Sequence, residues 1–193
     1  MSATELIAKI NQGIHQSYNH SQMELSESGE NMSVPLSRYE ENLVIIRPKN
    51  DQRDILWACF SDVVDKNIAD YIVFKAIGNE VICFIIELKK AKTSNNVIKA
   101  TNQILSTHPL VKMIYEKTTG ENAKNLKTIG IRVFGTGDKA QAKISRVEKF
   151  KIPEQLAKEN EHIAIGYFIQ NTRTERLPSL MHFYSDCKRI FPN

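Results

Sequence analysis

Hydrophobic positions along the chain follow two different spacings, which predict a mixture of strands and helices. Apolar runs typical of buried strands occupy residues 41–48, 69–77, 80–90, 127–137 and 162–170. Residues 143–152 predict a further short strand, while the apolar spacing of residues 54–64 fits either a strand or a helix. Between the first helical segment and the first strand, the polar stretch from His20 to Arg38 predicts a loop.

Helical spacing of apolar residues predicts helices over residues 3–18, 95–118, 153–161 and 177–191. Pro109 lies inside the second of these and is expected to break or kink it. The order of helix, strands, helix and strand predicts an α/β (α+β) fold with a mixed central sheet flanked by helices. The length of 193 residues fits one domain over residues 1–193.

One pair of strands has a register that can be counted from the sequence. Gly78 and Asn79 separate two strand-like runs and form a two-residue hairpin turn with glycine in the first central position. Residues whose numbers add up to 157 then face each other, so Asp70 faces Glu87. Two like charges in facing positions destabilise a sheet unless something compensates them, and two carboxylates are typical ligands of Mg²⁺.

Strand alternation adds a cation to this pair. Glu87 and Lys89 lie two residues apart and project from the same face of the strand, while Lys90 projects from the other face. A metal held by Asp70 and Glu87, with the Lys89 ammonium beside it, is the arrangement expected for phosphodiester hydrolysis. The alternative interpretation is an ordinary strand end where charged side chains meet solvent.

These residues resemble the motif of the PD-(D/E)XK nuclease superfamily. In this chain the motif is found as "IADYIV", with Asp70, and "FIIELKK", with Glu87 and Lys89. The resemblance implies a restriction-endonuclease-like αβββαβ core over about residues 3–135 and a strand and helix extension over about 136–193. It also implies catalytic roles for Asp70, Glu87 and Lys89, with Asp70 and Glu87 as ligands of Mg²⁺ or Mn²⁺.

The resemblance further implies an auxiliary role for Gln103, because some members carry a glutamine in the helix after the lysine strand. The alternative is a glutamine on a solvated helix face. Many members also place a glutamate of the first helix at the metal site. Glu5 lies on the predicted first helix, and Glu24 and Glu41 lie near its end or beyond it.

Charge is distributed unevenly along the chain and changes what partner is expected. Residues 1–88 contain 7 Lys+Arg and 13 Asp+Glu, whereas residues 89–193 contain 19 and 9. A basic second half suits a polyanionic partner such as nucleic acid, although a lysine-rich solvated surface is the simpler alternative. With the resemblance, a nucleic-acid partner is expected, DNA in preference to RNA, and analogy extends this to a homodimer.

Other features exclude several classes of function. No P-loop motif is present, and three widely spaced cysteines, Cys59, Cys83 and Cys187, argue against a zinc site or a disulfide framework. Cys83 is expected in the core. No membrane span or signal peptide is recognisable, so no membrane partner and a cytoplasmic location are expected. The predicted function is a metal-dependent nuclease; the alternative is a catalytically inactive accessory module that binds nucleic acid or protein.

Overall fold

The computed structural model describes residues 1–14, 16, 21–27, 32–38, 40–48, 68–135, 163–170 and 175–188. The predicted elements at 54–64, 143–152 and 153–161 lie outside these residues. Within them, no helix combines enough length with enough apolar character to cross a membrane.

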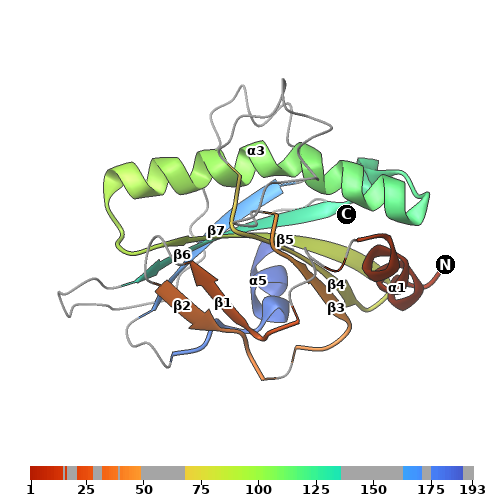
Figure 1. Cartoon of the computed structure of the whole chain (residues 1–193), viewed down its shortest axis with the longest axis horizontal. Helices are drawn as coiled ribbons and strands as arrows, with labels where there is room; N and C mark the ends of the chain where they lie inside the picture. The colour runs from red at the N-terminus through yellow and green to blue at the C-terminus, as the bar shows by residue number, and fades with distance from the viewer. Residues whose placement is uncertain are drawn as a thin grey trace.

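A five-stranded mixed sheet forms the centre of the fold (Figure 1). Its strands are, in spatial order, β3 (Leu43–Ile46), β4 (Tyr71–Ile77), β5 (Glu80–Lys89), β6 (Lys127–Gly135) and β7 (Ile163–Gln170). The first three pair antiparallel, whereas β5, β6 and β7 run parallel to one another. The predicted α+β class with a mixed sheet flanked by helices is confirmed.

Two helices cover one face of this sheet. They are α1 (Ala3–Gly13), which begins with a capping box between Ser2 and Glu5, and α3 (Ser94–Thr119), which packs over β5 and β6 and connects them. Their apolar stripes bury Ile10 and Ile104 against Ile72, Cys83 and Ile85 of the hairpin. Cys83 is a core residue, as predicted, and burial raises the pKa of its thiol. A 3₁₀ turn, η2 (Ala123–Asn125), links α3 to β6.

The opposite face is covered by α5 (Leu180–Cys187) and by a two-stranded ribbon, β1 (Glu24–Glu27) and β2 (Met32–Pro35). The loop predicted from His20 to Arg38 is therefore wrong over these two strands. Each is four residues long and has few apolar positions, among them the buried Leu25 and Val34, so the pattern is too weak to show in the sequence. The Tyr71 hydroxyl group donates to the Ser26 carbonyl and accepts from the Ser26 amide, both at 2.8 Å, which anchors β1 to β4.

Of the predicted break or kink at Pro109, the break is wrong, because α3 continues through this residue as one helix. Proline removes one backbone hydrogen bond from a helix interior. Buried residues on both sides, Ile104 before it and Val111 and Ile114 after it, pack on the same core and hold both halves of the helix against the sheet. Tertiary packing overrides the local preference here.

Candidate active site at the end of the hairpin

The candidate site lies where β4 begins and β5 ends. The observed register pairs Ile77 with Glu80 and Tyr71 with Ile86, as counted from the sequence, and Gly78 in the turn has a φ of 61°. One further step of the same register brings Asp70 opposite Glu87. The hairpin therefore delivers an aspartate and a glutamate to the same end of the sheet.

Glu87 and Lys89 are buried and form an ion pair. The Lys89 ammonium donates to Oε1 of Glu87, and the exposed fractions of the two residues are 0% and 4%. Alternation from Val81, Cys83 and Ile85 puts both side chains on the face covered by α1 and α3. The interpretation of this strand end as a solvated one is therefore wrong.

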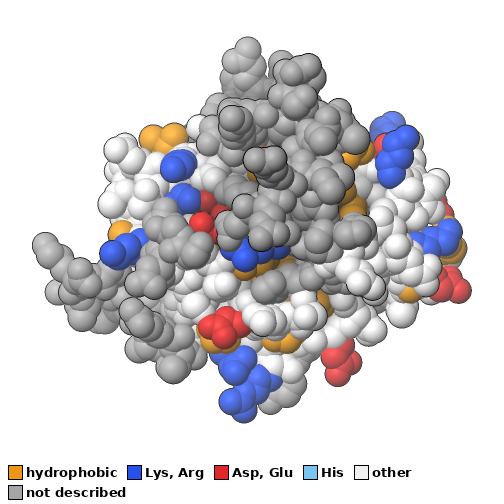
Figure 2. Space-filling model, viewed as in Figure 1, with side chains coloured by type: hydrophobic (Ala, Val, Ile, Leu, Met, Phe, Trp, Pro, Cys, Tyr) orange, Lys and Arg blue, Asp and Glu red, His pale blue; other side chains and the backbone are white. Residues whose placement is uncertain are grey.

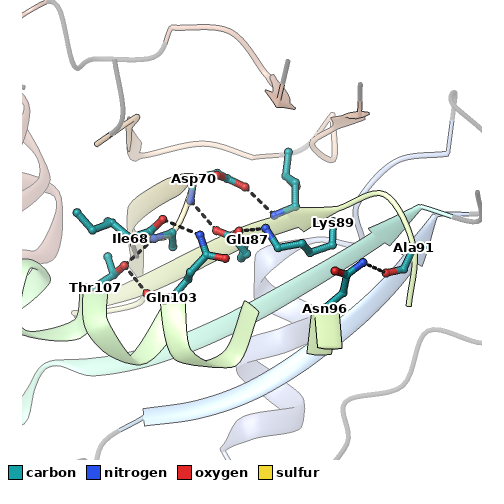
Figure 3. Close-up of polar contacts among 10 residues, drawn as sticks. Ile68, Asp70, Glu87, Lys89, Ala91, Asn96, Gln103 and Thr107 are labelled. Atoms are coloured by element: carbon teal, nitrogen blue, oxygen red, sulfur yellow. Dashed lines mark hydrogen bonds and ion pairs between the residues drawn. The ribbon is translucent and has the colours of Figure 1, made fainter. Parts of the chain in front are cut away.

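Asp70 reaches Glu87 through the main chain (Figure 3). The Asp70 amide donates to Oε2 of Glu87 at 3.0 Å, while Oδ2 of Asp70 accepts from the Leu88 amide at 2.9 Å. Each carboxylate is thus bound to a backbone N–H of the opposite strand, just beyond the last paired residues of β4 and β5. These hydrogen bonds and the Lys89 ammonium stabilise two neighbouring acids in a site where Asp70 is only 3% exposed.

Gln103 of α3 lies beside this group and is 4% exposed, so its interpretation as a solvated helix residue is wrong. Its Nε2 donates to the carbonyl of Ile68 at 3.2 Å. Its buried Oε1 accepts no hydrogen bond from any described residue. A buried amide oxygen without a donor is costly, so this atom is a natural acceptor or ligand atom for something that enters the site.

Thr107 of α3, which no motif in the sequence indicates, contacts the residue before Asp70. Thr107 lies one helical turn after Gln103, and its Oγ1 accepts from the Ala69 amide at 2.8 Å and donates to the Gln103 carbonyl at 2.6 Å. The spacing of four residues on one helix is the signal that points to it, since such residues share a helix face.

Basic and aromatic side chains flank the carboxylates on the side of β6 and β7. Arg132 is the register partner of Glu87 on β6 and is 1% exposed. It donates to the Gly166 carbonyl and to Oγ1 of Thr101, both at 3.4 Å. The Lys92 ammonium lies 3.9 Å from the ring centroid of Tyr167, the register partner of Arg132 on β7. Arg132 is therefore on the strand beside Glu87, and Lys92 contacts β7, one strand further on.

Glu5 and Glu24, two of the glutamates considered for the metal site, have partners elsewhere in the fold. Glu5 caps α1, and Glu24 accepts from Ser33 within the ribbon. No group of three or more His, Cys, Asp or Glu side chains gathers at one point among the residues that the structure describes. On the face shown in Figure 2, described Lys and Arg side chains are dispersed among Asp and Glu side chains rather than gathered in one area.

Comparison of the chain with protein-family models, with curated proteins and with solved structures found no match.

Proposed function

We propose that the protein is a metal-dependent nuclease that hydrolyses phosphodiester bonds, with DNA as the preferred substrate. The observation that carries this proposal is the hairpin register, which brings Asp70 to Glu87 while Lys89 contacts Glu87 from the same strand. The site also lies at the carboxyl ends of the parallel strands β5, β6 and β7, the edge at which ligands bind in open α/β sheets.

The donor atoms fit Mg²⁺ or Mn²⁺. Asp70 and Glu87 provide carboxylate oxygens, and Gln103 adds an amide oxygen that accepts no hydrogen bond within the described residues. These hard oxygen donors are the ligands that such cations prefer. Bound there, the cation would polarise a phosphate and acidify a water molecule.

The remaining residues of the site have roles that follow from their charge. Lys89 holds its ammonium against Glu87, within reach of a nucleophile or of charge that develops on the phosphate. Lys92, on the surface beside Tyr167, is suited to contact a neighbouring backbone phosphate. The basic second half of the chain supports a polyanionic substrate in the same way.

Cleavage of single- and double-stranded DNA and RNA in the presence of Mg²⁺ or Mn²⁺ tests the proposal. The variants Asp70→Asn, Glu87→Gln and Lys89→Met should each lower the rate by about 10²–10³-fold or more. Glu80→Gln and Lys127→Met are matched controls, because these residues form an ion pair between the first residues of β5 and β6, at the other end of β5 from the site. Equal rates for all five variants and the wild type would reject the assignment.

A catalytically inactive accessory module is the second candidate, and one observation favours it. Both carboxylates already have partners without a metal, since Lys89 and the Asp70 amide bind Glu87 and the Leu88 amide binds Asp70. Such a charge cluster can be a structural one. Nucleic-acid or protein binding that persists in EDTA, together with no calorimetric signal for Mg²⁺ or Mn²⁺, would support this candidate instead.

A further inference from the structure

Two of the residues that lead into β4 are held by α3 before the sheet begins. Ile68 and Ala69 are buried, and strand pairing starts only at Tyr71. Their peptide groups cannot use that ladder and need other partners. The Ala69 amide donates to Thr107, and the Ile68 carbonyl accepts from Gln103. Two side chains one helical turn apart therefore fix the main chain next to Asp70.

Thr107 is oriented for this contact by a second hydrogen bond. Its hydroxyl proton is directed at the Gln103 carbonyl at 2.6 Å, which leaves an oxygen lone pair for the Ala69 amide. Thr107 is itself fully buried. Thr118 of the same helix makes the same bond to its own helix, from Oγ1 to the Ile114 carbonyl at 2.8 Å, and its other hydrogen bond also stays within the helix. Thr107 and Thr118 therefore differ in one respect: the Thr107 hydroxyl also contacts the Ala69 amide, next to Asp70.

The position of Ala69 controls both carboxylates. The next peptide group belongs to Asp70, whose amide binds Oε2 of Glu87 and whose side chain binds the Leu88 amide. A displacement of the Ala69–Asp70 peptide would therefore move the Asp70 side chain and release Glu87 at the same time. The chain of contacts runs from Thr107 to Ala69, to Asp70 and then to Glu87 (Figure 3).

We propose that Thr107 is a positioning residue of the site, which holds Asp70 and Glu87 in place through the Ala69 amide without touching substrate or metal. This inference rests on the proposed nuclease function for its effect on activity. The effect on the main chain is independent of that function. Two kinds of measurement are therefore needed, one on the main chain and one on the metal and the reaction.

The test compares Thr107→Val, Thr107→Ser and Thr118→Val in the full chain. Valine keeps the shape of threonine and removes the hydroxyl, and serine keeps the hydroxyl. Thr118→Val removes a hydroxyl whose hydrogen bonds to described residues stay within its own helix. Amide hydrogen exchange followed by NMR should be faster at Ala69 and Asp70 in Thr107→Val than in the wild type, while the amides of β4 exchange as in the wild type. Thr107→Ser and Thr118→Val should match the wild type at these two amides.

The second measurement is titration with Mn²⁺ or Mg²⁺ and metal-dependent cleavage. Thr107→Val should weaken metal affinity and lower kcat by about 10–100-fold, the usual effect of losing a residue that supports a ligand, with KM for DNA little changed. Thr107→Ser should keep most of the metal affinity and kcat of the wild type. If Thr107→Val does not fold, Thr107→Ala takes its place with the same expectations.

The outcomes separate this inference from the proposed function. Unchanged exchange at Ala69 and Asp70 in a folded Thr107→Val protein overturns the positioning role, as does unchanged metal affinity in a protein whose wild type binds metal. A wild type that neither binds metal nor cleaves rejects the nuclease function, and the exchange data then still decide whether Thr107 holds the segment.

Discussion

The two ends of β5 each have a glutamate in an ion pair, but in opposite surroundings. Glu80 pairs with Lys127 at 2.8 Å, and their side chains are 48% and 26% exposed. Glu87 pairs with Lys89, and their side chains are 0% and 5% exposed. Water screens the first pair, so that it contributes little. The second pair has lost its water, so that each charge depends on the other. Burial, rather than residue type, distinguishes the candidate site from an ordinary strand end.

The surroundings also differ in what else is placed there. The Glu80 end adds Tyr184, whose hydroxyl group donates to Oε2 of Glu80 at 2.5 Å. The Glu87 end adds a second acid, Asp70, and the buried Arg132 of the next strand. Clusters of buried acids and bases are found disproportionately at functional sites. The comparison therefore indicates where along this strand chemistry would take place and where only stability is involved.

The largest expected difference between the ends is in how strongly the two charges of each pair are coupled. Glu87→Gln or Lys89→Met alone should lower the free energy of unfolding by about 3–5 kcal/mol, because each removes the opposite charge that faces a buried charge. The double variant should lose much less than the sum. Glu80→Gln, Lys127→Met and their double variant should change stability by about 1 kcal/mol or less.

Urea unfolding of the two double-mutant cycles measures both coupling energies. Asp70 and Arg132 remain next to the Glu87 pair and will reduce its coupling energy somewhat, so the comparison between cycles is the decisive quantity. Equal coupling energies at the two ends would mean that burial does not distinguish them.

Metal binding should also distinguish the two ends of β5. At a Mg²⁺ or Mn²⁺ concentration of about 100 times Kd, binding to the folded state alone adds about 2.7 kcal/mol to the free energy of unfolding. Wild type and Glu80→Gln should both gain this stability. Glu87→Gln should gain almost none, since it replaces a proposed ligand. Thermal unfolding with and without EDTA measures the gain, and an equal gain in Glu87→Gln would place the metal elsewhere.

The part of the site that could be predicted from sequence depends on local chemistry. The Gly78–Asn79 turn determines the register of β4 and β5, and the register alone brings Asp70 to Glu87. Strand alternation then puts Lys89 on the same face as Glu87. Each of these steps involves residues at most about twenty positions apart in the chain and needs no knowledge of the remaining fold.

The burial of the site could not be predicted in this way. The letters "ELKK" are typical of a solvated strand end, whereas the face of β5 that carries Glu87 and Lys89 is covered by helices from other parts of the chain. The contacts of Thr107 with Ala69 and of Gln103 with Ile68 join residues 38 and 35 positions apart. The ribbon of β1 and β2 was missed for a related reason, since its position depends on Tyr71 of a distant strand.

Glycines near the two ends of β5 should respond differently to substitution. A Cβ on Gly135 would lie 2.9 Å from the carbonyl oxygen of Lys90, a backbone atom with little freedom to move. Gly135→Ala should therefore cost about 1–3 kcal/mol and lower cleavage. Gly78 has open space around it but a φ of 61°, so Gly78→Ala should cost about 1–2 kcal/mol and leave cleavage unchanged.

Substitution by asparagine distinguishes backbone strain at position 78 from lack of space at position 135. It adopts the left-handed conformation more readily than alanine, so Gly78→Asn should restore part of the stability lost in Gly78→Ala. Gly135→Asn should be no more stable than Gly135→Ala, because the obstacle there is space. Unfolding and cleavage assays on the four variants check this, and a recovery at position 135 would contradict the steric argument.

The smallest effect is expected at the exposed end, and it depends on pH. Burial, together with the hydrogen bond to Glu80, raises the pKa of Tyr184 from 10.0 to about 12. A group whose pKa is raised on folding stabilises the fold below its unfolded pKa, and this stability is lost as the pH rises from about 10 to about 12. Tyr184→Phe should lose about 1 kcal/mol or less at pH 7, where one hydrogen bond is missing.

The same variant should lose less stability than the wild type between pH 9 and pH 12, because it has no phenol to ionise at this position. Urea unfolding across that range gives the difference, in which the titration of the lysines and of the other tyrosines cancels. Glu80→Gln should also make the free energy of unfolding less dependent on pH in this range, since the Glu80 carboxylate contributes to the raised pKa of Tyr184. Parallel curves for wild type and Tyr184→Phe would show that the Tyr184–Glu80 contact does not control alkaline stability.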